Sequence, residues 1–296
     1  MAQNLINAIT LGSLYLLFAL GMSLAWGTIG ILNFAHGSIF MFSSFTCYLL
    51  VQHVALPMPV LILIGLAVGA ALSVLVQVLA FEPIKRRNPD PHRAELQILV
   101  GGIGIASVPL AVAQHLTKSV PFGYSKSTFE VEVFHLGPVQ LTNVQLVILV
   151  AALVLAGSVG WWLRSARAGL ALRAIGVDAE VAGILGVNRR RLALGTMAVA
   201  GALAGVAGVL LTYYLGSIAA ESGDGFLLKA FAAIVLGGIG SVGGAVAGAM
   251  ILALAETAVV TQTSGMWVDA VSFGLIFAVL LFRPRGLFGR KEVRRT

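Results

Sequence analysis

RSARAGLALRAIGVDAEVAGILGVNRRR, residues 164–191, is the longest polar and basic interruption in an otherwise apolar sequence. It contains six arginines and two acidic residues, and long apolar runs flank it on both sides. Basic segments between apolar runs are typical of loops that connect membrane-spanning helices. The stretch therefore predicts a membrane protein whose spans are arranged around one central basic loop.

The centre of this loop, residues 177–186, is predicted to form a short helix. Asp178 can cap its N-terminus, and Glu180 lies in its first turn, where a negative charge is favourable. Gly186 stands where a C-cap glycine is expected.

One face of the short helix would be apolar, because Val181, Ile184 and Leu185 follow helical spacing. Two interpretations of that face remain open. The helix either lies on the membrane surface as a connector, or inserts its apolar face into a groove on a soluble partner.

Composition supports the membrane class for the whole chain. Hydrophobic residues make up 58% of the sequence and charged residues 10%, and the mean hydropathy is +0.97. A soluble domain carries about 25% charged residues. We therefore expect an all-α, polytopic helix bundle that forms a single transmembrane domain over residues 1–296.

The basic residues are concentrated. Of the 19 lysines and arginines, 16 lie in residues 82–95, 164–191 and 283–296. Basic segments beside spans face the cytoplasm, so the basic pI is not interpreted as binding to nucleic acid. The single cysteine, Cys47, excludes a disulfide within the chain.

The apolar runs predict about eight membrane segments at roughly 20 residues per crossing. They cover residues 5–26, 27–53 with a break near its start, 57–81, 96–114, 143–163, 192–218, 226–256 and 264–282. Between the fourth and fifth runs, FEVEVF (129–134) alternates like a short strand.

If all three basic segments lie on one side of the membrane, residues 226–256 must return to the side on which they start. GGIGSVGG (237–244) lies in their middle, with about 13 apolar residues on each side, too few for two ordinary spans. We expect a re-entrant or kinked hairpin whose glycine-rich break is buried and crowded between helices. This count places the N-terminus outside and the C-terminus in the cytoplasm.

Glycine motifs favour close packing of helices rather than cofactor binding. Gly238, Gly240 and Gly243 match the dinucleotide pattern GxGxxG, but membrane spans flank them and no soluble βαβ unit is present. The pairs Gly201/Gly205 and Gly244/Gly248 form small-xxx-small faces, which allow close approach of backbones. We expect no cofactor.

Asn33 and His36 lie in a glycine-flanked break within or near the membrane. They either bind the charged ends of a zwitterionic substrate at a broken helix, or form structural hydrogen bonds to a neighbouring helix. The acids near the ends of spans are expected to be solvated: Glu221, Asp224, Glu256 and Asp269. No catalytic arrangement or metal-ligand spacing stands out, so we expect no enzyme activity and no metal.

Three segments in order resemble the permease subunits of branched-chain amino-acid ABC importers. They are GTIGILNFAHGSIFM (27–41), LRAIGVDAEVAGILGVNRRRLAL (172–194) and KAFAAIVLGGIGSVGGAVAGAMI (229–251). The related urea and short-amide permeases share the pattern. The resemblance covers nearly the whole chain, and the ordered trio is more specific than any one segment.

The resemblance implies roles for these segments. Residues 164–191 would dock on a separate ATPase subunit, with Asp178, Glu180 and Gly186 at the positions of the importers' "EAA…G" pattern. The substrate path would be lined by Asn33, His36, Gly37, Gly238, Gly240 and Gly243. The further partners would be a second, similar permease, a periplasmic substrate-binding protein and the lipid of a bacterial inner membrane.

The expected function is import of branched-chain or other apolar amino acids, driven by ATP hydrolysis in the partner. Urea or short-amide transport is the alternative. An ion-coupled carrier is disfavoured, because such carriers use an intramembrane acid and the sequence offers almost none at mid-membrane depth.

The topology predicts where an introduced cysteine is accessible. Cysteine placed at Ser165 or Arg190 should resist an impermeant thiol reagent in intact cells, because both positions lie in the central basic loop. Labelling from outside would contradict the cytoplasmic assignment of that loop.

Overall fold

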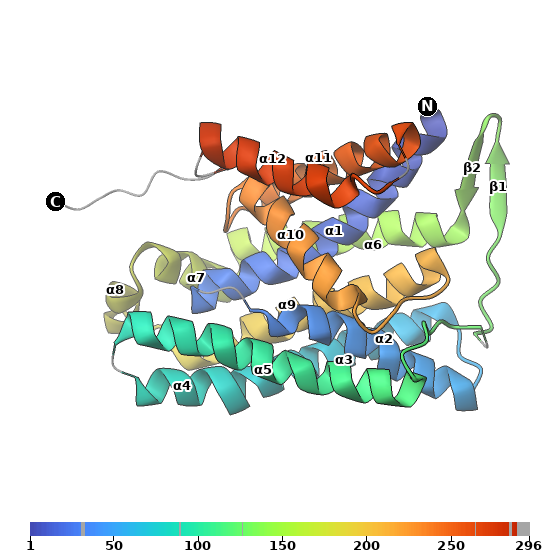
Figure 1. Cartoon of the computed structure of the whole chain (residues 1–296). Coiled ribbons are helices and arrows are strands. Elements are labelled where there is room, and N and C mark those ends of the chain that lie inside the picture. The colour runs from blue at the N-terminus through green and yellow to red at the C-terminus, as the bar shows by residue number, and fades with distance from the viewer. Residues whose placement is uncertain (31–32, 89, 126, 264, 284–285, 289–296) are drawn as a thin grey trace.

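The computed structural model describes residues 1–30, 33–88, 90–125, 127–263, 265–283 and 286–288. The described residues fold into a helix bundle with a small β-hairpin (Figure 1). Among the described residues, six helices are long and apolar enough to cross a membrane. The all-α polytopic fold is confirmed, whereas the count of about eight segments is not.

The first half of the bundle contains five helices and a π-helical turn. They are α1 (Ala2–Ile29), α2 (Ala35–His53), α3 (Met58–Val76), the π-turn η1 (Gln77–Phe81), α4 (Glu82–Arg87) and α5 (Pro91–Thr117). The hairpin β1 (Val133–Leu136) and β2 (Val139–Thr142) follows, antiparallel, with Val133 opposite Thr142.

The second half contains the central basic loop and the glycine-rich segment. Its helices are α6 (Asn143–Ser165), α7 (Arg167–Val177), α8 (Ala179–Ile184), α9 (Arg189–Leu215), α10 (Ser222–Gly237), α11 (Val242–Gln262) and α12 (Val268–Phe282).

Helix α9 lies in the core and packs closely against α3. A Cβ on Gly69 would overlap the carbonyl oxygen of Gly201, and one on Gly205 would overlap the carbonyl oxygen of Gly65. The predicted Gly201/Gly205 face is therefore a close backbone contact, as small residues permit in membrane bundles.

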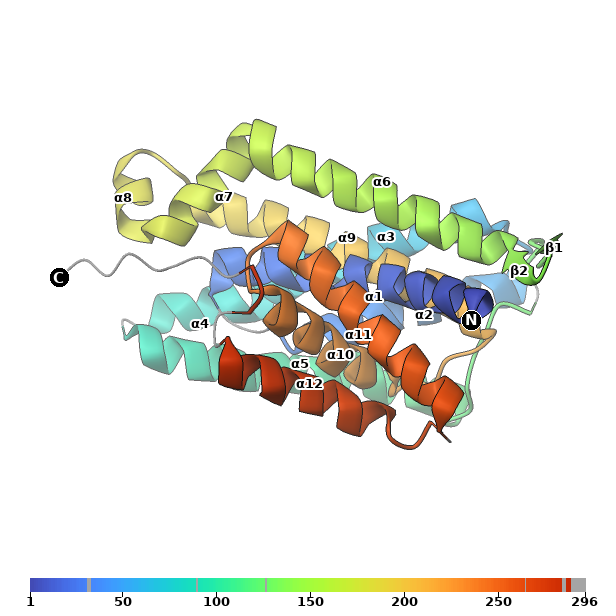
Figure 2. The same ribbon diagram turned by 90° about the horizontal axis from the view of Figure 1, so that it is seen from above.

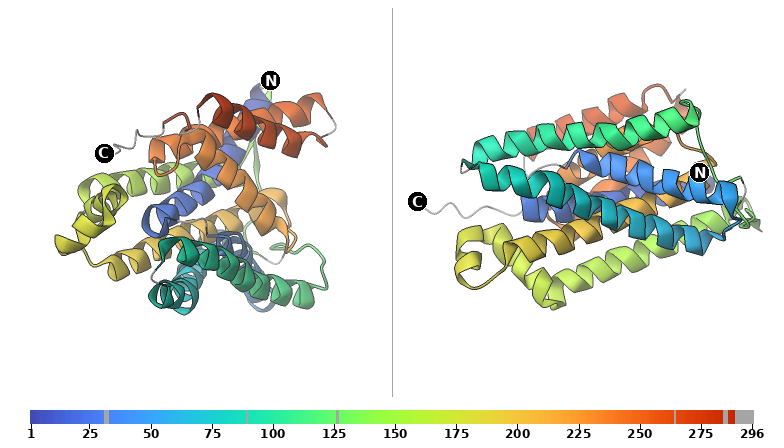
Figure 3. Two further views of the ribbon diagram at one scale, coloured as in Figure 1. Left: turned by 60° about the vertical axis from the view of Figure 1, so that its left-hand side comes forward. Right: turned by 90° about the horizontal axis from the view of Figure 1, so that it is seen from below.

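The long helices run between two ends of the molecule (Figures 2 and 3). Figure 1 shows α4 and α8 at one end, which we call the basic end. The N-terminus and the β1–β2 hairpin lie at the other, which we call the hairpin end. The first two basic segments thus share one end, as predicted, and most of the third, 283–296, lies outside the described residues.

The hairpin end is held by contacts between distant segments. Gln3 Nε2 donates to the Gln140 carbonyl (2.9 Å), and the Phe122 and Ile218 backbones pair in an antiparallel bridge. Gln114 Nε2 donates to Glu221 Oε1 (2.5 Å), which joins α5 to the start of α10 and lowers the pKa of Glu221. The expected strand starts later than predicted, at Val133.

The glycine-rich segment folds back at residues 238–241, as predicted, but its arms are longer than expected. α10 has 16 residues and α11 has 21, so α11 alone reaches spanning length. The N–H groups of Leu287 and Phe288 donate to the carbonyls of Leu236 and Gly237 (both 2.9 Å). The turn therefore lies beside the residues that follow α12.

Because α3 and α9 pack closely, the loss of stability caused by one added methyl group should depend on its position. Gly69→Ala should destabilise the protein by about 1–3 kcal/mol, because the methyl group overlaps a backbone carbonyl that cannot move aside. Gly104→Ala in α5 is the control, since an added Cβ there meets nothing within 4 Å. Thermal unfolding in detergent checks both, and equal stability of the two variants would contradict close α3–α9 packing.

Candidate functional site

The central loop folds into α7 and α8, and the local sequence explains the limits of α8. Asp178 Oδ1 accepts a hydrogen bond from the Val181 N–H (3.0 Å), which is the predicted N-cap. Gly186 adopts φ +88° just after the helix, as a C-cap glycine does. Glu180 belongs to α8, but its side chain lies outside the described part of the structure.

The apolar face of α8 points away from the bundle. Ile184 is 81% exposed and Leu185 78% exposed, while Val181 is 45% exposed. Ala182 on the other face is buried. An exposed apolar face next to charged residues requires either lipid or a partner protein to cover it.

An ion pair connects the loop to the rest of the basic end. Arg190 Nε lies 2.8 Å from Glu82 Oε1, which also accepts from Arg86 Nη2 at 2.5 Å. Glu82 is largely buried, with 14% of its side chain exposed. The first turn of α9 is thereby attached to α4.

The break between α1 and α2 forms where predicted. Gly30 ends α1 in the left-handed conformation (φ 76°). Asn33 Oδ1 accepts a hydrogen bond from the Ala35 N–H (3.0 Å), which helps to start α2. Residues 31–32 within the break lie outside the described residues.

His36 is fully buried at the start of α2. Its ring lies against Phe18 (centroids 4.6 Å apart), and a Cβ on Gly21 would come within 3.0 Å of Nε2. A backbone group of Phe18 approaches the ring, but its geometry falls short of a hydrogen bond. The two ring nitrogens and Asn33 Nδ2 are thus buried without a hydrogen-bond partner among the described residues.

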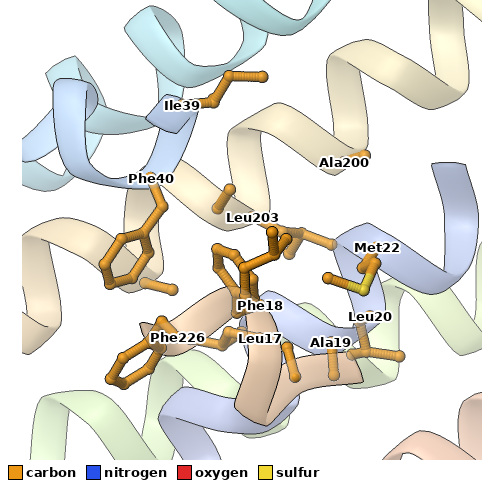
Figure 4. Close-up of a cluster of buried hydrophobic side chains, with 14 of the residues drawn as sticks. Leu17, Phe18, Ala19, Leu20, Met22, Ile39, Phe40, Ala200, Leu203 and Phe226 are labelled. Atoms are coloured by element: carbon orange, nitrogen blue, oxygen red, sulfur yellow. The ribbon is translucent and has the colours of Figure 1, made fainter. Parts of the chain in front are cut away.

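Three phenylalanines from different helices form a stack beside His36. Phe40 of α2 lies parallel to Phe226 of α10 (5.0 Å), and Phe18 of α1 meets Phe40 edge-on (5.1 Å). Figure 4 shows these side chains facing one another. Gly37 permits the close approach of α2 and α10, because its Cβ would lie 2.5 Å from the Gly223 carbonyl oxygen.

The glycine-rich turn packs on itself and on Gly286, since a Cβ on Gly237 would meet Gly244 and one on Gly286 would meet Gly238. Gly238 and Gly240 have positive φ (101° and 80°), and Gly237, Gly238 and Gly244 are buried. Gly240 and Gly243 are exposed, with nothing within 4 Å of an added Cβ. The expected crowding at Gly240 is therefore wrong. Glycine is required at this position because the backbone has a positive φ.

The expectation of solvated acids holds for Glu221, Asp224 and Asp269, which are exposed, but is wrong for Glu256. Glu256 is 2% exposed inside α11 and pairs with Lys229 of α10 (3.1 Å). α11 continues to Gln262, so this acid lies within the helix rather than at its end. Among the described residues, no group of three or more His, Cys, Asp or Glu could hold a metal ion.

Residues 4–280 match the family model described as "Branched-chain amino acid transport system / permease component". The chain is 33% identical to each of two high-affinity branched-chain amino acid transport system permease proteins, BraD of Pseudomonas aeruginosa and LivH of Escherichia coli. Each alignment covers 99% of the chain and 97% of the relative. A probable branched-chain amino acid transport permease protein LivH of Methanocaldococcus jannaschii is 27% identical over 96% of the chain and 91% of the relative.

The turn predicts different effects of the same substitution at two exposed glycines. Gly240→Ala should destabilise the protein by about 1–2 kcal/mol, because an L-residue is strained at positive φ. Gly243→Ala should be neutral or slightly stabilising, because Gly243 lies in helix α11 with open space around it. Thermal unfolding measures both, and a larger cost at Gly243 would contradict the assigned turn conformation.

Proposed function

The chain belongs to the family of branched-chain amino acid transport permeases, and we propose that it moves branched-chain or similar apolar amino acids across the bacterial inner membrane. It is a multi-pass membrane transport subunit rather than an enzyme. ATP hydrolysis by a separate ATPase subunit would supply the energy.

The main support for an ATPase partner is the exposed apolar face of α8. Ile184 and Leu185 expose most of their apolar surface at the basic end, where α4 and α8 lie. A helix whose apolar face projects away from its own protein fits the groove of a soluble protein. The Arg190–Glu82 pair would then carry motion of the docked loop into α4 and α9.

The proposed orientation follows from the same end of the molecule. With the basic end in the cytoplasm, the N-terminus and the β1–β2 hairpin face the outside. A periplasmic substrate-binding protein would contact the hairpin end. A second, similar permease would complete the transport unit within the lipid.

For the substrate path we propose the break at Asn33, His36 and Gly37. The buried polar atoms without partners would bind polar groups of the substrate when the surrounding helices separate. The glycines of the turn, Gly238, Gly240 and Gly243, would line the path toward the basic end.

The alternatives differ in substrate or in energy source. A urea or short-amide permease would share this architecture. Glu256 removes the sequence argument against an ion-coupled carrier, since it is a buried intramembrane acid. Lys229 balances its charge, however, and the relatives are named as components of amino acid transport systems, which favours the importer.

Co-purification with the ATPase tests the docking proposal. Ile184→Asp together with Leu185→Asp should release the ATPase from the purified complex and abolish substrate-stimulated ATP hydrolysis. Each well-buried apolar side chain lost from a groove costs about 1–3 kcal/mol of binding.

Val133→Asp together with Phe134→Asp is the matched control, because it places the same charges on exposed apolar residues at the hairpin end. This control should retain the ATPase. If the α8 double variant keeps as much ATPase and uptake as the wild type, α8 is only a connector between helices.

A further inference from the structure

Glu256 joins four helices through its two carboxylate oxygens. Oε2 accepts hydrogen bonds from the Tyr15 hydroxyl of α1 (2.6 Å) and from Lys229 Nζ of α10 (3.1 Å). Oε1 accepts from Ser272 Oγ of α12 (2.7 Å). We call Tyr15, Lys229, Glu256 and Ser272 the Glu256 cluster.

The members of this cluster depend on one another electrostatically. A buried carboxylate without a partner is strongly unfavourable, whereas a paired and hydrogen-bonded one is tolerated. The Glu256 side chain is 3% exposed and that of Lys229 24% exposed, so loss of Lys229 leaves the more deeply buried charge alone. Lys229 also lies 3.9 Å from the exposed Asp269 and keeps an anionic neighbour if Glu256 is neutralised.

Ring contacts continue from the cluster to the proposed substrate path. The Tyr15 ring meets Phe226 at 5.1 Å, and Phe226 lies parallel to Phe40 at 5.0 Å. Phe18, which contacts both of these phenylalanines, lies against His36. The carboxylate that orients the Tyr15 hydroxyl therefore helps to place the rings that cover His36.

We propose that Glu256 and Lys229 are positioning residues for transport, which hold α1, α10, α11 and α12 together and keep the aromatic stack over His36. This proposal depends on the proposed function in one respect, which is that His36 lines the substrate path. The pair acts through the packing of the helices and touches no substrate. Charge balance, rather than either charge itself, is what transport requires.

A double-mutant cycle tests this in proteoliposomes that contain the permease complex, its binding protein, ATP and labelled leucine. Lys229→Met should lower the maximal uptake rate about tenfold, and Glu256→Gln should lower it less. The KM for leucine should be unchanged in both variants. The Lys229→Met/Glu256→Gln double variant should recover to within about threefold of wild type, because no unpaired charge remains buried.

Two further variants separate the cluster from its surroundings. Tyr15→Phe removes the hydroxyl that donates to Glu256 and keeps the ring against Phe226, so it should slow uptake without changing KM. Asp269→Asn alters an exposed acid, 76% of whose side chain is accessible, and should stay within about twofold of wild type.

Thermal unfolding of the purified variants gives a readout that does not depend on the substrate. The melting temperature should fall most in Lys229→Met, fall less in Glu256→Gln and recover in the double variant. A double variant as impaired as Lys229→Met, or single variants with normal uptake and stability, would overturn the proposal. If wild type takes up no leucine, the proposed substrate is wrong, and the melting temperatures still decide whether the pair is coupled.

Discussion

The bundle depends on close backbone contact between α3 and α9. Helices in lipid gain little from the hydrophobic effect on association, so they are held by van der Waals contact between surfaces that fit closely. Gly65 and Gly69 meet Gly201 and Gly205 with no room for a Cβ, and Gly208 of α9 approaches the Phe40 carbonyl in the same way. This places α9 against both α3 and α2, and α1 packs against α9 as well.

Buried polar groups mark the places where packing alone does not explain the sequence. Among the described residues, His36 and Asn33 carry buried atoms without partners, whereas Glu256 has partners on three other helices. The first arrangement leaves hydrogen-bonding capacity free for a ligand, and the second uses it to hold helices together. A transport protein needs both, since a path must open while the helices that form it stay assembled.

Much of the fold follows from the sequence because apolar runs, caps and glycines act locally. The cap at Asp178, the turn after α8 and the fold-back at residues 238–241 all depend on neighbours within a few residues. The role of Glu256 depends instead on Tyr15, 241 residues away, and on Lys229, 27 residues away. No periodicity within α11 reveals such partners, so the sequence predicts solvent exposure for this acid near the end of an apolar run. At Gly240 the sequence also fails to identify the reason for the residue. Its sequence context does not distinguish a glycine crowded by neighbours from one required by a positive φ.

ATP-driven uptake of labelled leucine into proteoliposomes tests the central claim most directly. The chain would be reconstituted with its candidate ATPase, second permease and binding protein, with and without ATP on the ATPase side. If the chain is the permease of such an importer, accumulation requires both ATP and the ATPase, and unlabelled isoleucine or valine inhibits it by competition. Equal accumulation without ATP, or with the ATPase omitted, would contradict it.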